Sequence, residues 1–85
     1  MKVSLILTVK NEEETIEKLL RSILDQTRKP DEVVIVDGGS SDTTVDVIKK
    51  WKNKLNIKLF VKKGVSRGKG RNIAINKSSS EVIAV

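Results

Sequence analysis

The chain has 85 residues, no cysteine and no histidine, and its formal net charge is +6. This length makes one domain, and the missing side chains exclude disulfides, thiolate metal sites and histidine acid–base catalysis. No apolar run approaches the roughly 20 residues of a membrane span. We therefore expect a soluble, cytoplasmic domain.

The first segments predict a strand followed by an amphipathic helix. Apolar residues recur through Val3–Val9, as in a strand. Asn11 is a favoured residue at a helix start, so we expect it to cap the helix that follows. Apolar side chains between Ile16 and Leu24 then recur at helical spacing, and this stripe predicts core packing on one face. Pro30 marks the end of this region.

The next segments predict a buried strand, a glycine turn and a second helix. Glu32–Val36 contains four consecutive β-branched apolar residues, which suit a central parallel strand with both faces buried. The run stops at Asp37, and the glycines at 38–39 allow a tight turn. Side-chain oxygens at 40–42 can cap a helix. We expect that helix over residues 43–54, with Trp51 in the core.

The last third of the chain predicts two more strands around a basic loop. Residues 57–61 read as a third strand, and Gly64–Gly70 reads as a glycine-punctuated loop. A short helix is expected over 71–76, and a fourth strand over 82–85.

Strands that alternate with helices predict parallel pairing through right-handed crossovers. We therefore expect a three-layer, Rossmann-like α/β fold with a four-stranded parallel sheet in the order 3-2-1-4. Ligands of such sheets bind at the carboxyl ends of the strands. Thr8, Asp37 and the basic loop are predicted to converge there.

Five cationic side chains crowd into ten residues with no acid among them: Lys62, Lys63, Arg67, Lys69 and Arg71. Such a cluster suits a phosphate, a polynucleotide or an anionic membrane surface. The alternative is a solvated lysine-rich face. Glycines within the cluster favour a phosphate site.

Three stretches resemble family-2 glycosyltransferases of the GT-A type, in the same order along the chain. Asp37–Asp42 is similar to the family's D-[DG]-G-S-x-D turn, and Val3–Glu12 resembles its opening strand with Asn-Glu. Gly70–Ala74 resembles a later Ala-Arg-Asn segment. The resemblance covers essentially all 85 residues. It implies a GT-A-type half-domain, a single truncated unit over residues 1–85 that binds a nucleotide-diphosphate sugar.

The resemblance also implies which part of the nucleotide each site residue would contact. Thr8 and Asp37, at the ends of their strands, would contact the base or ribose. Arg71 would bind the phosphates, helped by Arg67 or Lys69. Many members of the family carry a second acid where this chain has Gly38. Asp37 has an alternative role as acceptor for the amides of the turn. The predicted nucleotide-binding residues are Thr8, Asp37, Gly38, Arg67, Lys69 and Arg71.

The resemblance places the family's Asp-x-Asp metal motif just after the fourth strand, and the given sequence stops at Val85. We therefore assign no catalytic residue and no metal ligand to this chain. Mn or Mg is expected only in a full-length enzyme, which the resemblance implies is inverting, and the chain alone is expected to be inactive. Self-association through an exposed sheet edge is a further expectation. The alternative function is a stand-alone basic module for nucleic acid or another polyanion, although aromatic stacking residues are scarce.

Overall fold

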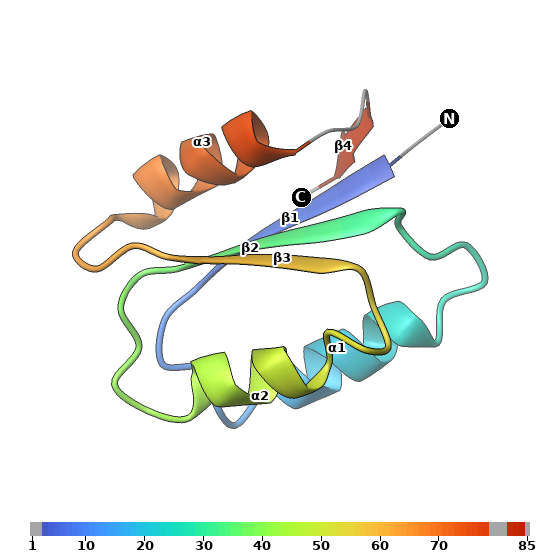
Figure 1. Cartoon of the computed structure of the whole chain (residues 1–85), viewed down its shortest axis with the longest axis horizontal. Helices are drawn as coiled ribbons and strands as arrows, with labels where there is room; N and C mark the ends of the chain where they lie inside the picture. Colours follow the sequence, from blue (N-terminus) through green and yellow to red (C-terminus); the bar gives the residue numbers. More distant parts are fainter. Residues whose placement is uncertain (1–2, 79–81, 85) are drawn as a thin grey trace.

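Helices cover both faces of a parallel sheet in the computed structural model, which describes residues 3–78 and 82–84 (Figure 1). The elements in chain order are β1 (Val3–Val9), α1 (Ile16–Leu24), β2 (Glu32–Asp37), α2 (Thr44–Lys50), β3 (Ile57–Val61), α3 (Arg67–Lys77) and β4 (Val82–Ala84). No helix in this described part of the chain is long and apolar enough to cross a membrane.

The sheet has the strand order β3-β2-β1-β4, and every neighbouring pair is parallel. β2 lies inside, and all six of its residues are buried, as its β-branched run predicts. β1 pairs with β2 from Ser4 to Val9, but with the three-residue β4 only from Val3 to Leu5. Three longer strands thus form most of the sheet. The α/β class, the parallel pairing and the strand order are confirmed.

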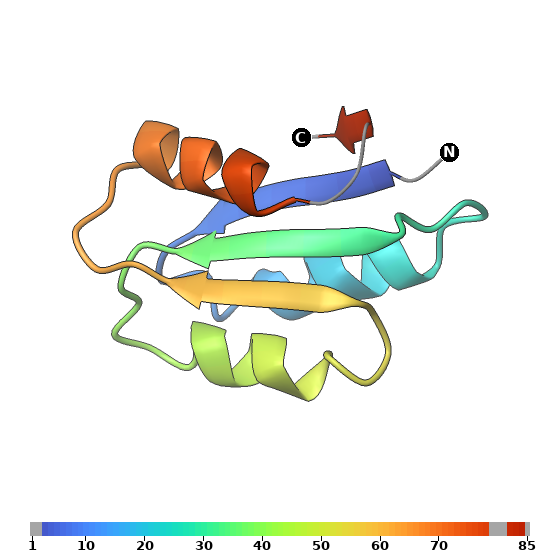
Figure 2. The ribbon, with the colours of Figure 1, turned by 45° about the horizontal axis from the view of Figure 1, so that its top comes forward.

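The two faces of the sheet carry separate cores. Helices α1 and α2 lie against one face, and α3 lies against the other (Figure 2). Because side chains alternate along a strand, Val33 and Ile35 enter the α1–α2 core, whereas Val34 and Val36 enter the α3 core. Trp51 is buried in the α1–α2 core, which confirms its predicted place.

The predicted start of the first helix is wrong. Asn11 has a left-handed backbone with φ of 52°, which directs the chain away from a helix. The carbonyl of Glu12 then accepts from the amides of Thr15 and Ile16, at 3.0 and 2.8 Å, so a separate turn precedes α1. The helix begins only at Ile16. Asn11 has another role, described below.

The ends of the other two helices also differ from expectation. α2 stops at Lys50, and turns follow it to residue 54. The expected loop over residues 64–70 is wrong in its second half, because α3 already begins at Arg67. The Ser66 hydroxyl accepts from the amide of Lys69 at 3.3 Å and caps this helix. In the expected fourth strand, Val85 lies outside the described residues.

Candidate functional site

Two adjoining hollows lie between α3 and the carboxyl end of β1. The first, which we call the helix hollow, has a volume of about 230 Å³ and is lined by Ile6, Leu7, Thr8, Arg67, Gly68 and Arg71. The second, the loop hollow, has a volume of about 350 Å³ and is lined by Thr8, Val9, Lys10, Asn11, Val36, Gly38, Val65, Ser66, Arg67 and Gly70. Thr8 and Arg67 line both. The hollows therefore form one site at the edge where open α/β sheets bind ligands.

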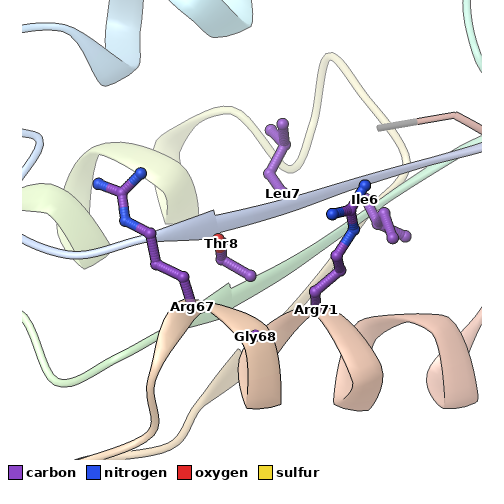
Figure 3. Close-up of a pocket in the computed structure, with 6 residues that line it drawn as sticks. All are labelled: Ile6, Leu7, Thr8, Arg67, Gly68 and Arg71. Carbon is purple, nitrogen blue, oxygen red and sulfur yellow. The ribbon is translucent and has the colours of Figure 1, made fainter.

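A close approach of α3 to the sheet positions the two arginines of the site. Gly70 is buried against the strands, and a Cβ atom there would lie 3.1 Å from Cγ2 of Thr8 and 3.5 Å from Cγ1 of Val36. Arg67 and Arg71 are four residues apart, so they share one side of the helix. Both side chains rise from α3 towards β1, on either side of Thr8 (Figure 3).

The site is cationic and offers a hydrogen-bonding hydroxyl. Among the described residues, Arg67 has one acidic neighbour, with its Nη2 atom 3.6 Å from Oε1 of Glu12. The Arg71 side chain is exposed and forms no ion pair with any described residue. Guanidinium groups suit phosphate oxygens because their donors bind in pairs. The arrangement can therefore hold an anion beside the Thr8 side chain.

The Asp37 carboxylate organises the turn after β2. Its Oδ1 atom accepts from the amides of Gly39 and Ser40 at 2.8 and 2.7 Å, and its Oδ2 atom accepts from the Ser40 hydroxyl at 2.6 Å. Asp37 is fully buried and pairs with Val9 in the sheet, whereas Thr8 pairs with Val36. Successive residues point to opposite faces, so Thr8 and Asp37 do not converge. The structure shows the turn-stabilising role, and Asp37 lines neither hollow.

The loops after β1 and β2 are joined by hydrogen bonds across about thirty positions in sequence. The amide of Asn11 donates to the Ser40 hydroxyl, and the amide of Ser41 donates to Oδ1 of Asn11, each at 2.8 Å. Further along, the amide and hydroxyl of Thr43 donate to Oε2 of Glu13, at 3.1 and 2.7 Å. Asn11 therefore joins the loops after β1 and β2 beside the site, and it does not cap α1.

Asp42 lies just before Thr43, the N-cap residue of α2, and its carboxylate binds the first residue of that helix. Its Oδ1 atom accepts from the amide of Thr44 at 3.0 Å and from the Thr44 hydroxyl. The hydroxyl bond from Thr44 is the main reason why the pKa of Asp42 lies below its ordinary value. The expected capping by residues 40–42 is therefore wrong in its position, because the N-cap of α2 is Thr43 and makes no side-chain cap bond. Asp42 binds Thr44 instead, and Ser40 and Ser41 contact Asn11.

Gly38 and Gly39 allow the turn to pass close to the loop before α3. A Cβ atom on Gly38 would lie 3.3 Å from the carbonyl oxygen of Val65, and one on Gly39 would lie 3.2 Å from Cα of Lys63. Gly39 also has φ of 101°, which favours glycine. Gly38 lines the loop hollow, as predicted for a site residue. The second acid typical of the resembled family would crowd the Val65 carbonyl here.

The structure thus brings together Thr8, Gly38, Arg67 and Arg71 among the predicted residues. Lys69 is exposed and lines neither hollow. Sequence reasoning missed Lys10 and Ser66, which line the loop hollow. A serine before a basic segment is a weak signal for a helix cap, and nothing in the sequence singles out Lys10.

The residues of the chain that the structure describes do not provide a metal centre. Among them, no three histidine, cysteine, aspartate or glutamate side chains are grouped so that they could hold a metal ion. The Asp37 carboxylate accepts hydrogen bonds from amides of the turn, and the Asp42 carboxylate accepts one from the first residue of α2. The guanidinium donors of Arg67 and Arg71, which line the helix hollow, suit an anion.

Comparisons with known proteins agree on one family. The model described as "Glycosyl transferase family 2" matches residues 4–85. The chain is 37% identical, over 98% of its length, to the poly(ribitol-phosphate) beta-N-acetylglucosaminyltransferase TarS of Staphylococcus aureus strain Mu50, and it spans 15% of that sequence.

Two solved structures are similar over nearly the whole chain. The crystal structure of S. aureus TarS 1-349 in complex with UDP-GlcNAc has a TM-score of 0.88 at 36% identity, covering 98% of this chain and 25% of that one. The mannosyltransferase PcManGT from Pyrobaculum calidifontis, in complex with GDP-Man and Mn2+, has a TM-score of 0.86 at 27% identity. That match covers 96% of this chain and 26% of that one.

Proposed function

Because the chain belongs to glycosyl transferase family 2, we propose that its site binds the nucleotide diphosphate of a sugar donor. The fold is of the GT-A type, as the resemblance implied. The observation that carries the proposal is the pair of guanidinium groups, Arg67 and Arg71, on either side of Thr8 (Figure 3).

Each part of the site matches one part of such a donor. The arginines supply positive charge and paired donors to the diphosphate. The Thr8 hydroxyl serves the ribose or base as a donor or an acceptor. Gly38 supplies backbone in the wall of the loop hollow without a side chain in the way. Asp37 acts indirectly in this proposal, because its carboxylate holds the turn that carries Gly38.

The similar structures were solved with UDP-GlcNAc and with GDP-Man. We therefore propose a nucleoside-diphosphate sugar as the donor, with either base. Acceptor binding and the transfer step would depend on the remainder of a longer protein, since the chain spans only 15% of TarS. Any Mn or Mg that accompanies the diphosphate would likewise need ligands beyond the described residues. We propose that the chain alone binds donor without transferring sugar.

Self-association is a separate part of the proposal. β4 pairs only with Val3–Leu5, so no described strand pairs with the outer edge of β1 from Ile6 to Val9. Unpaired strand edges favour pairing with another chain. We propose that this edge supports a homo-oligomer of the isolated chain.

Titration of the 85-residue chain with UDP, GDP, their sugars and inorganic diphosphate, followed by NMR, tests donor binding. We expect nucleoside diphosphates to bind more tightly than diphosphate and to shift the signals of Thr8 and Gly38. Arg71→Gln should weaken UDP binding about tenfold, as loss of a charged hydrogen bond does. Lys69→Gln is the matched control on the same helix, because Lys69 is exposed and lines neither hollow, and it should weaken UDP binding less than Arg71→Gln does.

The alternative function gives a different pattern in the same experiment. A general polyanion site would bind diphosphate as well as UDP, and single-stranded nucleic acid would bind with a steep loss at high salt. Arg71→Gln and Lys69→Gln would then weaken binding alike. Unchanged spectra with every nucleotide at millimolar concentration would contradict donor binding.

A further inference from the structure

Glu12 holds a carboxylate in a fixed position beside Arg67. Its Oε2 atom accepts from the Thr15 hydroxyl at 2.9 Å, and its amide donates to the Thr44 hydroxyl at 2.8 Å. The other oxygen, Oε1, lies 3.6 Å from Nη2 of Arg67. The Arg67 side chain is 80% exposed, against 36% for Glu12. The acid is therefore the less exposed partner of this pair and is held by a second hydrogen bond, whereas the guanidinium is the more exposed partner.

This ion pair is a poor source of fold stability. It is long and exposed, and ion pairs of this kind add little to the free energy of unfolding. Its position has a clearer consequence, because Arg67 is the residue that lines both hollows beside Thr8. No acidic side chain of the described residues lines either hollow. Glu12 lies outside the two hollows, but its negative charge is next to Arg67, which lines both.

We propose that Glu12 is a positioning residue that competes with bound phosphate for Arg67. The inference rests on the proposed function and adds a residue that sets how tightly the donor diphosphate is held. A phosphate group and the Glu12 carboxylate are both anions that seek the same guanidinium donors. An arriving diphosphate must therefore draw Arg67 away from Glu12, or share it against the repulsion of the nearby carboxylate. Arg71 forms no ion pair with a described residue, so it binds the anion without this competition.

The substitution Glu12→Gln isolates the charge. Glutamine keeps an oxygen that can accept from the Thr15 hydroxyl, and the backbone bond to Thr44 is unaffected. We expect Glu12→Gln to tighten inorganic diphosphate and UDP by about three- to tenfold at low ionic strength, and by less at high ionic strength. Glu14→Gln is the matched control, since it removes the same charge from an exposed neighbour. It should change affinity less than about twofold.

A double-mutant cycle tests whether the effect passes through Arg67. In an Arg67→Gln background, Glu12→Gln should leave diphosphate affinity unchanged. An equal gain in that background, or an equal gain from Glu14→Gln, would overturn the proposal, because either result indicates a general field. Spectra and unfolding midpoints of the variants identify any loss of fold, and Glu12→Gln should change neither.

The outcomes separate this inference from the function on which it rests. If UDP binds and shifts Thr8 but Glu12→Gln leaves affinity unchanged, the inference is wrong and donor binding stands. If Glu12→Gln tightens diphosphate through Arg67 but UDP binds no better than diphosphate, the inference stands and nucleotide binding is wrong. Absence of diphosphate and UDP binding in both proteins would overturn both.

Discussion

A Cβ atom on Gly70 would lie 3.1 Å from Cγ2 of Thr8, closer than side chains normally approach. The helix α3 therefore packs on β1 at a distance that only glycine permits without movement. Both arginines of the site belong to this helix, so their position relative to Thr8 depends on the same contact.

Replacing this glycine should displace α3. We expect Gly70→Ala to lose about 1 kcal/mol of unfolding free energy, since overpacking outweighs the gain in helix propensity. It should also weaken UDP binding, because Arg67 and Arg71 move away from Thr8. Gly68→Ala is the control, since a Cβ atom there has no atom within 4 Å. That variant should gain about 0.5–1 kcal/mol in urea unfolding, and equal gains at both positions would contradict the packing argument.

We expect the buried carboxylate of Asp37 to contribute to the free energy of unfolding more than to UDP affinity. Asp37→Ala leaves two turn amides and the Ser40 hydroxyl without their acceptor. We expect a loss of about 2–4 kcal/mol in urea unfolding. Asp46→Ala, on an exposed position of α2, should cost far less. Unchanged stability together with lost UDP binding would instead indicate a direct contact between Asp37 and the ligand.

Acid should weaken the start of α2 through Asp42. The pKa of this carboxyl is lowered in the folded chain, chiefly by the hydrogen bond from the Thr44 hydroxyl, and its ordinary value is 3.8. A lowered pKa means that the ionised group stabilises the fold above pH 3.8, and that this contribution is lost as pH falls through the folded pKa. Asp42→Asn should therefore be less stable than wild type at neutral pH, and the difference should shrink in acid. Denaturant unfolding at several pH values checks this, with Asp46→Asn as control; a difference independent of pH would contradict it.

The unpaired edge of β1 makes a prediction about assembly. Sedimentation of the isolated chain should show association that rises with protein concentration, since the outer side of Ile6–Val9 pairs with no described strand. A strict monomer at the highest attainable concentration would contradict this part of the proposal.

The fold was predictable from sequence because its signals are local and repeated. The run from Val33 to Val36 indicates a strand buried on both faces, and alternation with amphipathic segments indicates parallel crossovers. The start of α3 was not predictable, because Gly68 and Gly70 lower helix propensity. The need for a glycine at Gly70 arises from a contact with Thr8 that is far away in sequence.

The site was predictable in part for a similar reason. That Thr8 and the basic segment share the carboxyl edge follows from topology alone. That Asp37 faces the other side follows from the sheet register, in which it pairs with Val9. The sequence does not specify this register. The contacts of Asn11 with Ser40 and Ser41 join residues that are equally distant in sequence, whereas the local sequence around Asn11 indicates a helix cap.

Those contacts of Asn11 bear on how the site can be re-engineered. The segment after β1 supplies the amide and the side-chain oxygen of Asn11. The segment after β2 supplies their partners, the hydroxyl of Ser40 and the amide of Ser41. A transplant of either segment from a related enzyme would leave its counterpart without partners. Chimaeras intended to alter donor preference should therefore exchange residues 10–15 and 37–44 together, so that these hydrogen bonds are kept.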